Sequence, residues 1–444
     1  IAQCLVGSEM CIRDRYMRGV YVLLLISLFG YAGRVGGQES VTITQCYEWA
    51  RANYPQIHQM GLIDQTERYS LSNVGKAWLP QLSVSGKASY QSDVTKLPFD
   101  GDKISSLLPG FEIPSLSKDQ YQVVAQVDQT IWDGGSTRSA RALTRAEAIA
   151  NREQLESELY ALNDRVNQIY FGCLLQDELI RQNALLQKEL QVNIERIEAM
   201  MENGVANQSD LESMEVELLN ARQNEIELKA SRTVYRQMLA TFINKPLTDQ
   251  VVLKTPESPE RSLFTQINRP ELRALDAKSE WIETQNKQVT AGLMPRIGAF
   301  VQGGYGRPGL NMLEDSFEPY YVAGVRLSWN LGKLYTLKND RRKIEVSRRQ
   351  IDVQRETFLF NTRLQLLQQN TEIKKMTDLM RADDDIIRLR TSIKQAAEVK
   401  LENGVISVTD LIREINAEDM ARQTAAAHRV QRLMTIYNYM YTTN

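Results

Sequence analysis

The chain has 444 residues, of which 43% are hydrophobic and 24% charged, and its 53 Lys and Arg residues nearly balance its 55 Asp and Glu residues. This balance excludes the strongly basic surface with which nucleic-acid-binding proteins neutralise phosphates. The four cysteines form no C-x-x-C pair and have no histidine at ligand spacing, so we expect neither a zinc site nor a disulfide framework.

The beginning of the chain is typical of an exported protein. Met17 and Arg18 precede a short apolar segment, and small residues follow up to Gly37, which predicts a secretory signal peptide over residues 17–37. Residues 1–16 have no role in such a signal and resemble translated sequencing-adaptor read-through, so we interpret them as a non-native leader. After Gly37 no apolar run approaches the roughly 18 residues of a transmembrane helix, so any crossing of a membrane must use strands.

Three short segments recur in the same order in the two halves of the chain, which predicts an internal duplication. The recurring pairs are 53–57 with 268–272, 78–82 with 293–297, and 201–205 with 401–405. We therefore expect a first structural repeat over residues 38–265 and a second over 266–444. Each repeat is predicted to contain a helix, two strands and a helical hairpin.

Four segments alternate apolar and polar residues, as strands with one apolar face do. They lie at 82–90, 121–131, 297–305 and 321–329, with loops expected at 97–119 and 306–319. A glycine-containing turn follows each second strand, at Asp133-Gly134-Gly135 after Trp132 and at 330–333 after Trp329. These turns are expected to lead from strand directly into helix.

Beyond each turn the apolar period changes to steps of four and three, which predicts coiled-coil helices. In the first repeat these positions are Leu155, Leu159, Leu162, Val166, Ile169 and Cys173, then Leu190, Ile194, Ile197 and Met201. A continuous helix over 136–202 would be roughly 100 Å long. Gly204 and Gly404 are expected to end the long helices, and Ser209-Asp210 and Thr409-Asp410 to cap the helices that follow.

This combination requires several copies of the chain. Four strands cannot close a barrel, and an open sheet in a membrane would leave backbone amides unpaired in lipid. Helices of this length also need neighbours along their whole length.

The duplication, the order of strands and hairpins, the Trp132-Asp133-Gly134-Gly135 junction and the paired Asn-Gly-Val turns together resemble the TolC-like outer-membrane efflux protein (outer-membrane factor) family, over Val41 to Tyr441. The resemblance implies a mainly α fold with membrane β: a long coiled-coil α-barrel continuous with a transmembrane β-barrel shared between chains. It implies a homotrimer in the outer membrane and its lipid, extending into the periplasm, with an equatorial region at 244–266 and the chain ends. Its implied role is a passive exit duct of a tripartite efflux pump or type I secretion system, working with a periplasmic adaptor (membrane fusion protein) and an inner-membrane transporter.

The resemblance also implies roles for the hairpin turns. Gly204, Val205, Gly404 and Val405 are candidate adaptor contacts, although helix termination alone would explain both glycines. Asp210, Asp410 and Arg413 are candidate residues of a periplasmic gate. Asp410 matches a position that forms acidic constriction rings in the family, but helix capping would also favour an aspartate there. Arg413 stands where the family can supply a second aspartate, which leaves the selectivity of the ring open.

No enzymatic site, metal site or cofactor is expected. The two histidines, His58 and His428, are far apart and are interpreted as structural. Consecutive residues Asp383, Asp384 and Asp385 point about 100° apart on a helix and cannot converge on one cation, so we interpret them as a solvated or pore-facing patch. The alternative function is a periplasmic coiled-coil adaptor or structural tether, which would not need four strands entering long helices.

Overall fold

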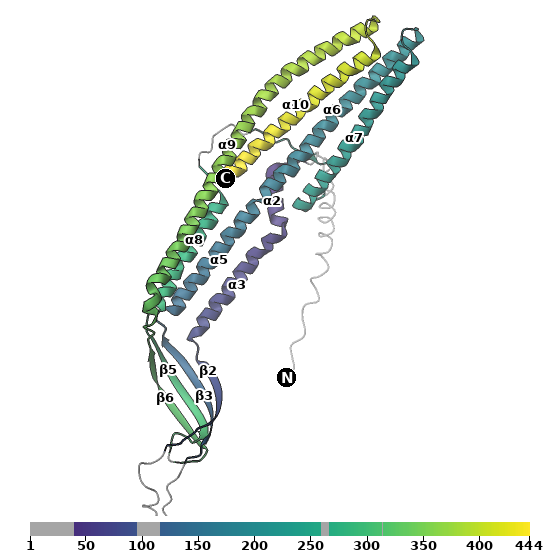
Figure 1. Ribbon diagram of the computed structural model, residues 1–444. Helices are drawn as coiled ribbons and strands as arrows, with labels where there is room; N and C mark the ends of the chain where they lie inside the picture. The colour runs from purple at the N-terminus through teal and green to yellow at the C-terminus, as the bar shows by residue number, and fades with distance from the viewer. Residues whose placement is uncertain (1–39, 96–115, 259–265, 313) are drawn as a thin grey trace, which may run out of the picture.

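The computed structural model describes residues 40–95, 116–258, 266–312 and 314–444. It is an elongated molecule with a β-sheet at one end and two helical hairpin turns at the other (Figure 1). The predicted leader 1–16 and signal peptide 17–37 lie outside the described residues, as do parts of the predicted 97–119 loop and 244–266 region.

A helix, two strands and a helical hairpin follow one another in each half of the chain, and the first half has further short elements. The first half contains β1 (Ser40–Val41), α2 (Ile43–Asn53), η1 (Pro55–Ile57), α3 (His58–Gly75), η2 (Lys76–Trp78), β2 (Gln81–Tyr90), β3 (Asp119–Trp132), α5 (Ser136–Tyr160), α6 (Leu162–Glu202), α7 (Gln208–Ile243) and β4 (Val252–Leu253). The second half contains α8 (Pro270–Ala291), β5 (Arg296–Arg307), β6 (Glu318–Ser328), α9 (Lys333–Glu402) and α10 (Val408–Thr443). The four predicted strands and both predicted hairpins are thus present.

Four strands form one antiparallel sheet in the order β2-β3-β5-β6. The apolar row of β3, β5 and β6 is exposed, whereas the alternating row on the opposite face is half-buried. Tyr121, Val301 and Val325 belong to the exposed row. Away from this sheet, β1 pairs in parallel with β4 and ties the start of the described chain to the segment after α7.

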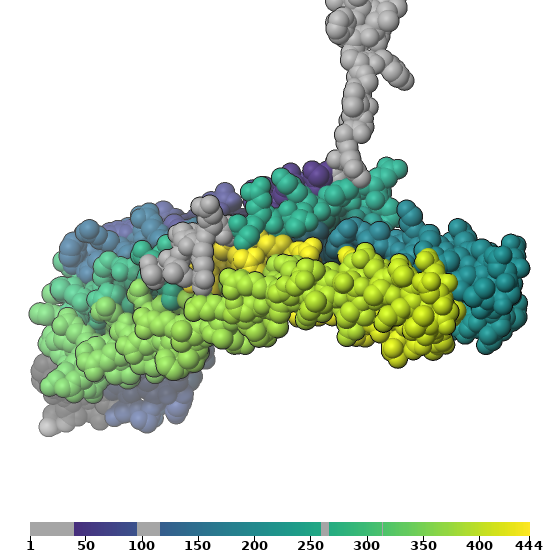
Figure 2. All heavy atoms as spheres, turned by 90° about the horizontal axis from the view of Figure 1, so that it is seen from above, coloured from purple at the N-terminus to yellow at the C-terminus, as the bar shows by residue number. Residues whose placement is uncertain are grey.

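The helices form a single curved layer rather than a globular bundle. Near the sheet the packing order is α3, α5, α8 and α9, and near the turns it is α7, α6, α10 and α9. Figure 2 shows the yellow helix α10 lying between α9 and the teal helices of the first half. The helix α9 therefore forms one edge of the layer along its whole length, and α3 and α7 form the other edge.

The predicted heptad positions are buried where helices of this layer meet, except Met201, which is partly buried. Leu155, Leu159 and Leu162 form one cluster with side chains from α3, and Val166, Ile169 and Cys173 belong to a larger cluster with α2 and α7. Near the turns, one apolar cluster joins α6, α7, α9 and α10. Within the described ranges, no helix is both long and apolar enough to cross a membrane.

Two local expectations were wrong. The long helix of the first half is not continuous, because a turn at Ala161 separates α5 from α6, whereas α9 runs unbroken for 70 residues. The second helix of each hairpin, α7 or α10, is not capped by Ser209 or Thr409. Their N-caps are Asn207 and Ser407, which lie two residues earlier and have the extended backbone that a cap requires.

Candidate functional site at the hairpin turns and the strand–helix junction

The two hairpin turns have the same backbone geometry. Gly204 and Gly404 adopt φ angles of 75° and 70°, as expected for glycines that end helices in the left-handed conformation. The Gly404 amide donates to the carbonyl of Leu401 at 2.8 Å and the Val405 amide to that of Lys400 at 2.8 Å. The same two bonds occur in the first turn. This Schellman pair leaves the following valine side chain exposed in both turns, at 59% for Val205 and 68% for Val405.

The predicted gate aspartates hold the start of the next helix. Asp410 is the third residue of α10, and its carboxylate accepts hydrogen bonds from the Ser407 amide and hydroxyl. The Ser407 hydroxyl oxygen accepts from the Asp410 amide in return, at 3.2 Å. Asn207 and Asp210 make the equivalent capping box in the first hairpin. Capping is therefore a physical role that both aspartates have, independent of any role in a pore.

Asp410 also has a cationic neighbour. The Arg413 guanidinium lies 3.5 Å from the Asp410 carboxylate, and both side chains are exposed. Hydrogen bonds from Ser407, followed by the charge of Arg413, lower the pKa of Asp410 below its ordinary value. The structure thus places Arg413 beside Asp410 on the exposed face of α10, so the two predicted gate residues of this hairpin form one mixed-charge pair.

A buried charge network behind the turns was missed by sequence reasoning. The Glu418 side chain is 3% exposed and lies 2.6 Å from the Lys394 ammonium, while the Thr391 hydroxyl donates to it at 2.6 Å. Arg422 also pairs with Glu418, and Lys394 pairs in addition with Glu189 of α6. The network therefore joins α9 and α10 to each other and to the first hairpin.

The network keeps its acid ionised. Burial acts to raise the pKa of Glu418, but the hydrogen bonds from Lys394, Thr391 and Arg422 outweigh it and lower that pKa to about 2. The neighbouring Asp419 carboxylate accepts a hydrogen bond from the Gln423 side chain, but burial outweighs it and raises the pKa of Asp419 to about 6. Adjacent acids on α10 thus have opposite shifts because one has cationic partners and the other is desolvated.

The three consecutive aspartates of α9 are not equivalent. Asp384 and Asp385 are exposed, as expected for a solvated patch. Asp383 is buried, contrary to that expectation, and its carboxylate lies 2.8 Å from Nδ1 of His428 on α10. His428 thus has a structural contact between α9 and α10. Among the residues that the structure describes, no group of three or more His, Cys, Asp or Glu side chains could hold a metal ion.

At the other end of the helices, the strand–helix junction has its own polar site. Gly134 and Gly135 adopt φ angles of 65° and 83°, and the Asp133 carboxylate accepts from the amides of Gly135 and Thr137 at 2.9 and 2.6 Å. A side chain on Gly134 would collide with Met294, so glycine is required there by space as well as by conformation. In the second half, Gly332 instead has an ordinary helical φ of -59°.

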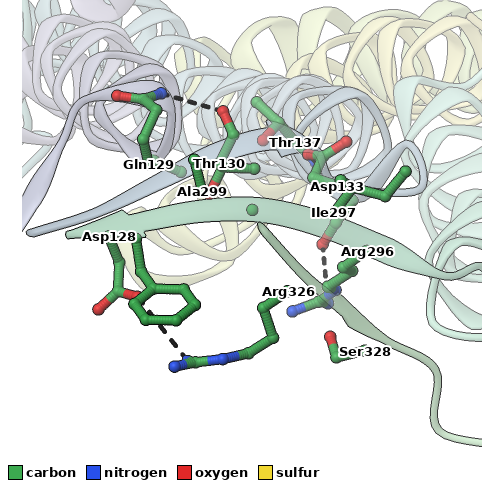
Figure 3. Close-up of a pocket in the computed structure, with 14 residues that line it drawn as sticks. Asp128, Gln129, Thr130, Asp133, Thr137, Arg296, Ile297, Ala299, Arg326 and Ser328 are labelled. Atoms are coloured by element: carbon green, nitrogen blue, oxygen red, sulfur yellow. Dashed lines mark hydrogen bonds and ion pairs between the residues drawn. The ribbon is translucent and has the colours of Figure 1, made fainter. Parts of the chain in front are cut away.

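A hollow of about 290 Å³ lies between this junction and the sheet. Figure 3 shows Arg326 of β6 reaching across β5 toward Asp128 of β3, at a distance of 3.8 Å. Arg296, also in the hollow, has its guanidinium 3.5 Å from the Ser136 hydroxyl. The wall of the sheet at this end therefore has polar side chains of both charges on the face opposite the exposed apolar row.

The comparisons with known proteins agree with this geometry. Residues 46–245 match the family described as outer membrane efflux protein. No curated protein matches the sequence. The solved structure of CusC, described as a transmembrane channel, is 15% identical, with 90% of this chain and 92% of that chain covered and a TM-score of 0.63.

Two further solved structures have a similar fold. The outer membrane protein VceC of Vibrio cholerae is 11% identical, with 90% of this chain and 96% of that one covered and a TM-score of 0.62. The outer membrane channel MtrE of Neisseria gonorrhoeae, in its open state, is 15% identical, with 90% and 88% covered and a TM-score of 0.59. At these identities the solved structures establish the fold. Residues 46–245 thus resemble the outer membrane efflux protein family, and the described chain has the fold of solved outer-membrane proteins.

Proposed function

We propose that three copies of this chain form an export channel that crosses the outer membrane as a shared β-barrel and continues into the periplasm as an α-barrel. In this proposal each copy supplies four strands and one curved layer of helices. The two repeats, 38–265 and 266–444, supply equivalent halves of each copy. The channel is a passive exit duct for efflux or for type I secretion, supplied by an inner-membrane transporter through a periplasmic adaptor.

The observation that carries the proposal is that the sheet and the helical layer each have two unpaired edges, and that these edges lie on the same two sides of the molecule. Within the described residues, β2 and β6 each pair on one side only. The helix α9 continues from β6 along one edge, and α3, which precedes β2, lies on the other. One neighbouring copy could therefore pair with the sheet and pack against the helices at the same time.

The helices at these edges have exposed apolar side chains at heptad spacing. On α9 they are Val346, Val353, Phe360 and Leu367; on α3 they are Leu62 and Tyr69; and on α7 they are Leu219 and Ile226. Such seams normally pack into another helix, because large apolar side chains repeated every seven residues are costly to leave in water. A second copy of the chain supplies the complementary seam. The exposed apolar row of the strands would then face lipid.

At the periplasmic end we propose that the hairpin turns contact the adaptor through Gly204, Val205, Gly404 and Val405. Each valine is an exposed apolar group on a rigid turn, which suits it to a pocket on a partner helix. We also propose that Asp210, Asp410 and Arg413 line the gate. Because Arg413 pairs with Asp410, we expect a weaker preference for cations than a ring of unpaired aspartates would give.

The test uses the purified full chain in mild detergent. Light scattering should give the mass of three chains, and planar bilayers should show discrete channel events. A monomer without channel events would refute the proposal and favour the periplasmic tether. For the gate, Asp410→Ala should alter the conductance or its block by divalent cations. Ser407→Ala is the matched control, because it removes the hydroxyl half of the capping box but leaves the carboxylate in place.

A further inference from the structure

Large side chains on the polar face of β5 and β6 lie opposite glycines. Tyr320 is the direct partner of Gly304, and Phe300 is the direct partner of Gly324. These residues belong to the half-buried row, on the face opposite the exposed apolar row. Each aromatic ring therefore has a partner without a side chain on the neighbouring strand.

Both rings occupy the space that a side chain of the partner would take. A Cβ atom added at Gly304 would overlap the Tyr320 ring, and one added at Gly324 would lie 3.2 Å from Cε1 of Phe300. In contrast, a Cβ added at Gly303, the adjacent residue on the other face of β5, would meet nothing within 4 Å. The close contact is thus specific to the polar face and not a property of every glycine in the strand.

Two side chains of β6, Tyr320 and Arg326, extend along the sheet instead of away from it. The side-chain amide of Gln122 on β3, on the far side of β5, donates a hydrogen bond to the Tyr320 hydroxyl. Arg326 crosses β5 in the same way: its guanidinium carbon lies 4.8 Å from the centre of the Phe300 ring, and Asp128 of β3 is its ion-pair partner. Gly304 has no side chain and therefore leaves room on β5 for the Tyr320 ring to reach Gln122.

From this arrangement we propose that Gly304 and Gly324 set the width of the channel inside the strand region, by seating Tyr320 and Phe300 flat against the wall. The inference rests on the proposed function, in which this face of the sheet lines the pore. A methyl group at Gly304 forces the Tyr320 ring to rotate off the wall, because the ring is the end of a side chain and moves more easily than the paired backbone. The Tyr320 ring then projects into the channel and narrows it.

The test measures both the position of the ring and the width of the passage. A reporter thiol, Ser328→Cys, is placed on the same face toward the helical end of β6, where Ser328 is exposed. Cys46 and Cys173 are buried and should contribute little background. The labelling rate with a bulky polyethylene-glycol maleimide, added on the extracellular side of proteoliposomes, does not depend on whether the periplasmic end is open.

Gly304→Ala should slow labelling by at least about twofold relative to Gly303→Ala, and electron microscopy of the variant in nanodiscs should show the Tyr320 ring turned off the wall. Adding Tyr320→Ala to Gly304→Ala should restore the rate. Equal labelling of the two glycine variants, or a Tyr320 ring that stays on the wall, would overturn the inference. An absence of assembly and channel events in the unmodified protein would instead refute the proposed function.

Discussion

The charge network at Glu418 makes a quantitative prediction about the second hairpin. Glu418→Gln removes the negative charge that Lys394 and Arg422 surround but keeps the shape of the side chain. Lowering the pKa of Glu418 from 4.5 to about 2 corresponds to about 3 kcal/mol of preference for the ionised form. Because the Arg422 side chain is 42% exposed, solvent screening should reduce the measured loss to about 2 kcal/mol.

Hydrogen exchange with mass spectrometry measures this loss where it occurs. Local opening of α10 around Glu418 should become about 30-fold more frequent, since 1.4 kcal/mol is a factor of ten. Peptides from the middle of α10 should therefore exchange faster, while peptides from α5 should not change. Glu215→Gln on α7 is the matched control, because Glu215 is an exposed glutamate of another helix near the turns.

The pH dependence gives an independent check. The pKa of Glu418 is lower in the folded protein than in the unfolded chain, so its contribution to stability is complete above about pH 4.5 and is lost as the pH falls toward 2. The difference in melting temperature between the wild type and Glu418→Gln should shrink over that range. A variant that exchanges like the wild type at neutral pH, or a difference that persists at pH 2, would refute this account of the network.

Three further predictions concern the turns and the cysteines. Ser407→Ala should destabilise the start of α10 by about 1 kcal/mol, because the hydroxyl that takes part in the capping box is lost. The amides of the first turn should then exchange faster with solvent. An unchanged exchange rate would contradict this prediction. Gly404→Ala should destabilise the turn by about 1 kcal/mol, because the φ angle of Gly404 is 70°. Gly61 lies within α3 and has open space around it, so Gly61→Ala should be neutral or stabilising. Thermal unfolding of both variants tests this difference in sign. Cys46 and Cys173 should resist iodoacetamide in the native protein at pH 8, because both are buried and burial raises the pKa of each thiol to about 12. Rapid modification of the folded protein would contradict their placement.

Features encoded by local periodicity or by a single residue were predictable from the sequence. The alternation at 121–131 and 321–329 identified strands whose apolar row is exposed, and the step of four and three through Leu190, Ile194 and Ile197 identified the buried seam of α6. Gly204 and Gly404 were recognisable because a glycine after a long helix commonly ends it in the left-handed conformation.

Features that depend on which helices lie side by side were not predictable. Lys394 and Glu189 are 205 residues apart, and their contact follows from the lateral order of α6, α10 and α9. The same order buries Asp383 against His428 while Asp384 and Asp385 stay in solvent, although all three residues are aspartates. The break at Ala161 has no proline or glycine to signal it.

The way in which the charge network is divided between the hairpins favours their movement relative to each other. Glu418 and its partners Lys394, Thr391 and Arg422 all belong to α9 and α10, and only Glu189 comes from α6. If the hairpins separate, Glu418 keeps its cationic partners, so no buried charge is left unpaired, and Glu189, whose side chain is already 29% exposed, gains access to water.

Among the described residues, Arg196 and Glu402 form a second ion pair between the hairpins. Its side chains are more exposed still, and such pairs contribute little to stability. The electrostatic cost of separation is therefore small, and the main resistance comes from the apolar cluster shared by α6, α7, α9 and α10. A gate at the turns would thus be held shut chiefly by apolar contact. A partner that covers apolar surface there, such as an adaptor bound at Val205 and Val405, is the kind of ligand that would shift it toward the open state.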